Sequence, residues 1–151
     1  MKLARPKISA NLTEATIEIM VDDGGLESAH LRDEVAANCN IAAAHLTDVL
    51  IEDVHLVGAH LGRIVARDVL MRRCDISSAS LDNGMLVRVE FINCRMTGVD
   101  FSYTSIHDVT FRDCQMDRVT FTKANLRRVE FTGCSLEGVN FSVADCTDVN
   151  R

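Results

Sequence analysis

The chain has 151 residues, of which 47% are hydrophobic and 25% charged, as expected of one globular domain. Its net charge of −6 argues against a general nucleic-acid-binding protein, which would have a basic surface. No stretch approaches the roughly 18 apolar residues of a membrane-spanning helix, and the first residues lack the apolar core of a signal peptide. We therefore expect a cytoplasmic protein with no membrane or direct nucleic-acid partner.

Residues 1–23 do not follow the pattern of the rest of the chain. Short stretches there resemble the repeating units that follow, but the sequence IEIMVDDGG interrupts the regular spacing of their apolar residues. We expect 1–23 to form an N-terminal cap and 24–151 to form the main domain. The inward position Glu34 lies in the least regular stretch that follows, and we expect local irregularity there rather than a catalytic carboxylate.

The main domain has a period of five residues. All 24 positions from Leu31 to Cys146, taken in steps of five, are apolar, and chance would give this with a probability on the order of 10⁻⁸. The position two residues earlier is apolar in 22 of 25 cases. Neither a helix nor a long strand returns its side chains at this interval, so each unit is predicted to be a short strand followed by a corner.

The residue two positions after each central apolar residue forms the predicted corner. It is Gly, Asn or Asp in 14 of 24 cases, and these residues tolerate positive φ or form side-chain-to-backbone turns. Charged residues also recur here: positions 48, 68, 88, 108, 128 and 148 read Asp, Asp, Arg, Asp, Arg, Asp. We expect neighbours in this series to form surface ion pairs, each worth about 0–1 kcal/mol.

A second period of 20 residues predicts four sides in each coil. Phenylalanine alternates with Met, Ile or Leu at the central position, and cysteine recurs every 20 residues. Like residues pack in columns, so bulky columns are expected on two opposite sides and small ones on the other two. The predicted core columns are Phe91, Phe111 and Phe131; Phe101, Phe121 and Phe141; and Cys74, Cys94, Cys114 and Cys134. A straight column of thiols does not converge on a metal, so we interpret the cysteines as small buried hydrophobic residues.

With these motifs, the chain resembles the pentapeptide repeat proteins, whose unit is written loosely as A(D/N)LXX. The segments ASLDN at 79–83 and ANLRR at 124–128 match it well. The resemblance covers about residues 24–150 and implies an all-β fold, a right-handed quadrilateral parallel β-helix of about six coils. Because inward side chains fill such a helix, we expect no active-site cleft, no enzyme activity, no cofactor and no metal site.

Six outward apolar residues flank one edge of the predicted square in its middle coils, and they are a candidate partner patch: Leu50, Val65, Leu70, Met85, Val87 and Ile92. The C-terminal coils are a candidate dimer end, formed by Phe131, Phe141 and Val149. We expect homodimers that pack end to end, because the last coil is an open edge.

Two functions are consistent with these features. The first is a rigid, non-enzymatic scaffold for a protein partner. The alternative comes from the resemblance: some bacterial members of the family protect DNA gyrase and related topoisomerases from inhibitors by imitating duplex DNA. Duplex DNA of about 30 Å would carry roughly 18 negative charges. The net charge here is −6, with arginines interspersed, so the first function is preferred.

Overall fold

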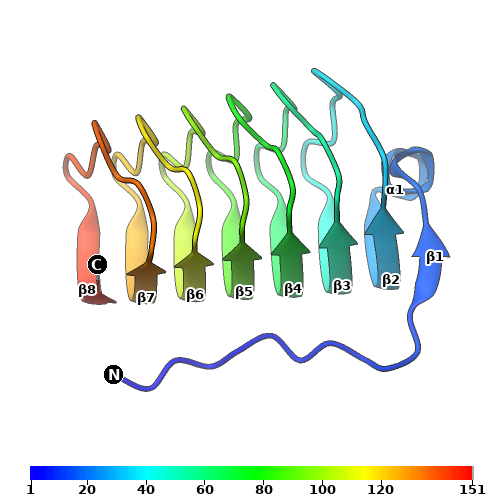
Figure 1. The fold of residues 1–151 in the computed structure, drawn as a ribbon, viewed down its shortest axis with the longest axis horizontal. Helices are drawn as coiled ribbons and strands as arrows, with labels where there is room; N and C mark the ends of the chain where they lie inside the picture. The colour runs from blue at the N-terminus through cyan, green and yellow to red at the C-terminus, as the bar shows by residue number, and fades with distance from the viewer. Residues whose placement is uncertain (151) are drawn as a thin grey trace.

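A computed structural model describes residues 1–150, which form a β-solenoid around one parallel sheet (Figure 1). Arg151, the last residue of the predicted main domain, lies outside the described part. The elements are β1 (Thr13–Ala15), α1 (Ile17–Asp23), β2 (Gly25–Arg32), β3 (His45–Glu52), β4 (Val65–Arg72), β5 (Met85–Ile92), β6 (Ser105–Arg112), β7 (Asn125–Thr132) and β8 (Asp145–Asn150). The strands are paired in chain order from β1 to β8.

Each coil contains 20 residues and has four sides. Val49 on β3 pairs with Val69 on β4, and Val69 pairs with Val89 on β5. Each strand from β2 to β7 covers two sides, which we call side 1 (first half) and side 2 (second half). The other two sides are joined by single bridges such as His55 to Asp75. The predicted parallel β-helix is confirmed, and with β1 it makes about seven turns rather than six.

Every fifth residue bends the backbone by adopting positive φ. The predicted corner residues Asn83 and Gly98 have φ values of 59° and 71°. Residues that adopt positive φ less readily than Gly or Asn have the same geometry at other corners, including Tyr103 with a φ of 59° and Val143 with a φ of 57°. A β-branched residue is rarely found there, so the position in the coil overrides the local preference of the residue.

The interior is packed in columns, as the period of 20 predicts. Phe91 and Phe111 are stacked with ring centroids 5.0 Å apart, and Phe111 also meets Phe101 of the opposite side edge to face at 6.0 Å. Phe101 and Phe121 stack in the same way at 5.2 Å. Both geometries are favourable for aromatic rings, so the two phenylalanine columns interlock across the axis.

The cysteine column lies in the same interior. Cys74, Cys94 and Cys114 are buried, Cys134 is half-buried, and all four are free thiols. Hydrogen bonds with Cys114 and Cys74, together with burial, raise the pKa of the Cys94 thiol well above its ordinary value. A protonated, enclosed thiol is a poor nucleophile, so Cys94 acts as a packing residue.

Helix α1 covers the first coil. Thr16 caps its N-terminus by accepting a hydrogen bond from the Ile19 amide (3.1 Å), and Ile17 and Met20 are buried under it. The Glu34 carboxylate accepts a hydrogen bond from the Ile17 amide at 2.6 Å. Glu34 therefore anchors the helix to the solenoid.

Residues 1–12, which we call the arm, lie outside the coil. They extend from β1 along the solenoid, and the N-terminus lies beneath β7 and β8 (Figure 1). The arm contains no helix or strand. Within residues 1–150, none of the helices has the length and apolar character needed to cross a membrane.

Replacing Phe111 by Ala should destabilise the protein strongly. Phe111 is fully buried and contacts rings above, below and across from it, so the substitution leaves a cavity that costs about 3–5 kcal/mol. The free energy of unfolding in urea measures this loss. The matched change Phe141→Ala, at a half-buried position near the C-terminal end, should cost clearly less. Equal losses at both positions would contradict the packing described here.

Candidate interaction surface

One corner of the solenoid carries a line of charged residues, which we call the corner column: Asp48, Asp68, Arg88, Asp108, Arg128 and Asp148. These residues stand at the bend between side 1 and side 2 of strands β3 to β8. Arg88 binds Asp68 with two hydrogen bonds of 2.7 and 2.9 Å, and Arg128 binds Asp108 with two of 2.7 and 3.0 Å. The expected pairing between neighbouring coils is therefore found at these two positions.

The arm lies along the corner column and is bound to it through its backbone. The Ala4 amide donates to Asp108 (3.2 Å), the Lys7 amide to Asp68 (3.1 Å) and the Ser9 amide to Asp48 (2.8 Å). The five residue steps from Ala4 to Ser9 span about 16 Å when extended, and the three coil steps from Asp108 to Asp48 span about 14 Å. An extended segment therefore matches the spacing of the carboxylates.

The arm lies towards side 2 of the corner. Arg5 forms an ion pair of 3.7 Å with Glu90, which is only 7% exposed although its side chain points out of the coil. Thr110, the next residue in the same outward column, is 4% exposed. Leu3, Pro6 and Ile8 are half-buried, while the arm residues between them are exposed. These three side chains thus face the solenoid.

The carboxylates under the arm are held in their ionised form. Hydrogen bonds from the Ser9 side chain and backbone lower the pKa of Asp48. The Arg88 guanidinium, followed by the Lys7 amide, lowers the pKa of Asp68. The Arg128 guanidinium and the Ala4 amide do the same for Asp108. Each of these aspartates therefore keeps its negative charge to a lower pH than a free aspartate.

The candidate partner patch flanks this same corner. Val65, Met85 and Val87 lie on side 1, where Val65 and Met85 are partners in the sheet and Met85 is 37% exposed. The other three residues lie on side 2 and are half-buried: Leu50, Leu70 and Ile92. The arm runs between the two groups, so the chain already places a segment of its own on the edge that the sequence indicated.

The course of the arm was not predicted from the sequence. One signal was available: residues 1–13 contain Lys2, Arg5 and Lys7 but no acidic residue, while the corner column is rich in aspartate. The contacts themselves connect residues up to 104 positions apart, and no local pattern specifies them.

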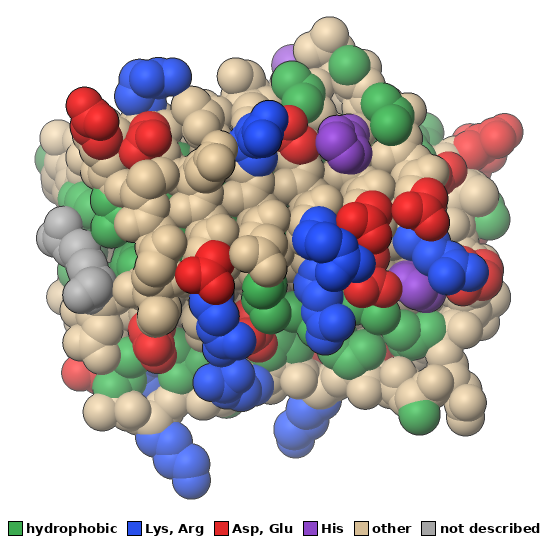
Figure 2. Space-filling model, viewed as in Figure 1, with side chains coloured by type: hydrophobic (Ala, Val, Ile, Leu, Met, Phe, Trp, Pro, Cys, Tyr) green, Lys and Arg blue, Asp and Glu red, His purple; other side chains and the backbone are tan. Residues whose placement is uncertain are grey.

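A second charged group lies at the other end of side 2. Arg73 binds Asp53 with two hydrogen bonds of 2.9 and 3.0 Å, and His30 contacts Glu52 at 2.9 Å. In Figure 2, blue and red side chains lie next to each other across the visible face instead of forming separate fields of one charge. The Arg73–Asp53 pair is largely open to solvent, so it contributes little to stability, whereas His30 and Glu52 are half-buried.

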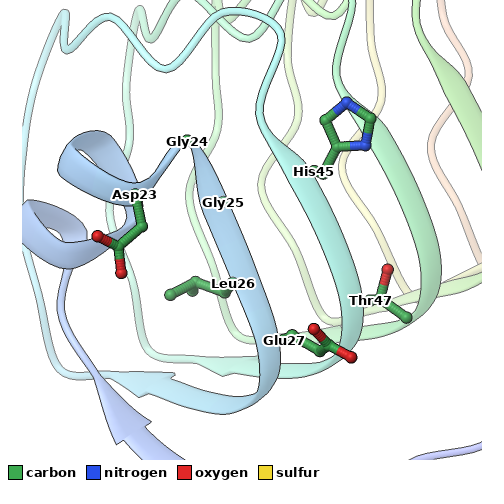
Figure 3. A pocket seen from close by; sticks show the side chains of 7 residues that line it. All are labelled: Asp23, Gly24, Gly25, Leu26, Glu27, His45 and Thr47. Atoms are coloured by element: carbon green, nitrogen blue, oxygen red, sulfur yellow. The ribbon is translucent and has the colours of Figure 1, made fainter.

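A shallow groove of about 320 Å³ lies where α1 meets β2 and β3 (Figure 3). Its polar side chains are Asp23, Glu27, His45 and Thr47, and those of Asp23 and His45 point away from each other. Gly25 fits here because a Cβ atom would overlap the His45 carbonyl oxygen. Among residues 1–150, no three His, Cys, Asp or Glu side chains are placed to hold a metal ion. The groove therefore offers no converging set of catalytic groups.

The candidate dimer end has a partly open interior. Phe131 is buried, whereas Phe141 and Val149 are half-buried. Val143, in the same coil as Phe141, is 78% exposed. In the described part of the chain, β8 pairs with β7 on one side only.

Comparisons with known proteins agree with this fold. Residues 84–150 match the model of the pentapeptide repeat region. Full-length QnrB1, a plasmid-mediated fluoroquinolone resistance protein, is 17% identical with a TM-score of 0.50, over 92% of this chain and 85% of QnrB1. Rfr23, a pentapeptide repeat protein from the cyanobacterium Cyanothece 51142, is 13% identical with a TM-score of 0.44, over 88% and 95% of the two chains. No curated protein matches the sequence.

The fold is thus a four-sided β-solenoid. Its residues 84–150 match the pentapeptide repeat region, which confirms the resemblance found in its sequence. At these low identities the likeness to solved structures concerns the fold alone.

Acid should release the arm from the corner column. The pKa values of Asp48, Asp68 and Asp108 are lowered in the folded protein, so their contribution is fully present above the ordinary aspartate pKa of about 3.9 and is lost as pH falls from there through the lowered pKa values. Proton–nitrogen NMR should show the amides of Ala4, Lys7 and Ser9 unchanged from roughly pH 5 to 8 and shifting towards unstructured positions below about pH 4. The Phe111 amide, which lies within the paired strands of the solenoid, is the control. Release between pH 5 and 8 would contradict the assigned contacts.

Proposed function

We propose that the protein is a non-enzymatic scaffold that binds another protein at the edge formed by the corner column. The observation that carries this proposal is the set of six outward apolar side chains on both sides of that edge. An apolar patch on a charged exterior is often a partner site. The interior supports the proposal as well, because the packed phenylalanine and cysteine columns fill it and leave the outer surface for recognition.

The half of the patch on side 1 is the more accessible. Met85 is 37% exposed, and its sheet neighbours Val65 and Ser105 are half-buried. On the other side of the corner, Glu90 is only 7% exposed and pairs with Arg5 of the arm. We therefore place the first contact of the partner on side 1.

The double substitution Val65→Glu, Met85→Glu should abolish capture of the partner. Two buried carboxylates in an apolar contact would lower recovery roughly tenfold or more. The measurement is affinity purification of the tagged protein, with mass spectrometry of what co-purifies. Asn125→Glu, in the same outward column but two coils beyond Met85, is the matched control and should leave recovery intact. Equal recovery with all three proteins would remove the proposed site.

The same purification tests the alternative function. QnrB1, whose fold this chain shares, is a fluoroquinolone resistance protein. A DNA-imitating surface is supported here by the aspartates of the corner column and by the net charge of −6. It is weakened by Arg88 and Arg128, which neutralise two of those aspartates. Recovery of gyrase subunits, together with protection of supercoiling from a quinolone, would favour the alternative.

We also propose that two copies associate through their C-terminal coils. Phe141 and Val149 supply half-buried apolar surface, and Phe131 lies buried beneath them as support. The open side of β8 supplies backbone groups for a second strand.

Light scattering after size exclusion should give twice the chain mass of 16.7 kDa. Val149→Glu places a charge in the proposed interface and should restore the mass of one chain. Thr47→Glu, on side 1 of β3 and far from this end, is the control. A wild-type protein that stays at the mass of one chain at high concentration would contradict the proposal.

A further inference from the structure

The arm binds the side chains of Asp48, Asp68, Glu90 and Asp108, which we call the seat. Residues of the solenoid hold the three aspartates of the seat in place. Asp68 is held by Arg88, Asp108 by Arg128, and Asp48 by a hydrogen bond of 2.8 Å from the Ser28 hydroxyl. None of these three partners belongs to the arm. The carboxylates are therefore oriented before any segment binds, which is the property of a preformed binding site.

The seat recognises an extended backbone more than a particular sequence. Three of the contacts are hydrogen bonds from arm amides to the carboxylates of Asp48, Asp68 and Asp108. Any non-proline residue offers such an amide. Recognition through main-chain groups, with a few side-chain positions for selectivity, is the usual mode for extended peptides.

Charge supplies that selectivity. The arm side chain that reaches an acidic residue of side 2 is Arg5, which contacts Glu90. Lys7 lies beside Asp68, and its charge favours the ionised carboxylate. Three of the four carboxylates also pair with arginines of the solenoid, Asp68 with Arg88, Asp108 with Arg128 and Glu90 with Arg112. The small excess of negative charge that remains favours a basic segment over an acidic one.

The arm is bound in a way that allows its exchange. It forms no strand pairing with the solenoid, and most of its residues are exposed. Residues 9–11, at its junction with β1, are exposed as well. Displacing the arm breaks a few surface contacts and leaves the hydrogen bonds between the coils intact.

We propose that the seat formed by Asp48, Asp68, Glu90 and Asp108 is a binding site for an extended, basic segment of a partner protein, which the chain's own arm occupies until it is displaced. This proposal rests on the scaffold function above and adds the chemistry of the partner: a flexible segment rich in Lys and Arg, without acidic residues. The arm then acts as an internal competitor that lowers the apparent affinity for the partner.

The test uses the full chain and a fluorescent synthetic peptide with the sequence of residues 1–12. In the variant Arg5→Glu, Lys7→Glu the internal arm is repelled by Glu90 and Asp68. Fluorescence anisotropy should then show the peptide binding roughly tenfold more tightly than to the wild type. A peptide in which Lys2, Arg5 and Lys7 are all replaced by Glu is the probe control and should not bind.

Matched aspartate variants locate the peptide. In the Arg5→Glu, Lys7→Glu background, Asp68→Ala should weaken binding about tenfold, whereas Asp53→Ala should change it by less than about twofold. The two aspartates are closely matched, since both bind an arginine one coil further on and their φ values are 55° and 54°. Of the two, Asp68 lies under the arm. Thermal unfolding of both variants checks that each is folded.

Several outcomes would overturn the proposal. These are absence of peptide binding to any variant at millimolar concentration, equal binding to the wild type and to Arg5→Glu, Lys7→Glu, and equal effects of the two aspartate variants. If the wild type is a dimer and the variant Arg5→Glu, Lys7→Glu is a monomer, the seat binds the arm of a second copy instead. Since the assay uses purified components, a negative result leaves the test of side 1 by Val65→Glu, Met85→Glu unaffected.

Discussion

The backbone of this protein returns to the same register after every five residues, and that return depends on a left-handed residue at each corner. Such a residue costs about 1–2 kcal/mol for an ordinary L-amino acid, less for Gly, Asn or Asp. The chain meets the requirement with Asp or Asn at many corners but also with Arg, Lys, Tyr and Val143. Hydrogen bonds from each coil to the next stabilise the bend, so coils in the middle tolerate corner residues that an isolated turn would reject.

Strict repetition also determines what the exterior can do. Because equivalent positions lie one above the other, a single residue type repeated every 20 positions becomes a line along the rod. The corner column shows the result: two Asp–Arg pairs lie in that line, and Asp48 is held by Ser28. Because these carboxylates lie one or more coils apart, their spacing matches that of amides in an extended chain. A single turn of the solenoid could not provide such a row of carboxylates.

The periodic part of the molecule could be predicted from the sequence. Inward columns, opposite phenylalanine sides, corner positions and charge pairs all follow from counting residues, because each contact joins positions at a fixed separation of 20. The parts that repetition does not specify were missed. The role of Glu34 depends on helix α1, which lies outside the repeat, and the course of the arm depends on contacts between Ala4 and Asp108. The candidate patch was placed along the corner the arm follows, but its outward apolar residues gave no sign of what lies over them.

The direction of the arm has a consequence for how the molecule is assembled during synthesis. The ribosome makes the arm first, yet the carboxylate that receives Ala4 belongs to β6, and the arginine that orients it belongs to β7. The arm can therefore dock only stepwise, with Ser9 on Asp48 of β3 first and Lys7 on Asp68 of β4 next. Its outermost contact, from Ala4 to the Asp108 that Arg128 orients, is completed only after residue 128 has left the exit tunnel.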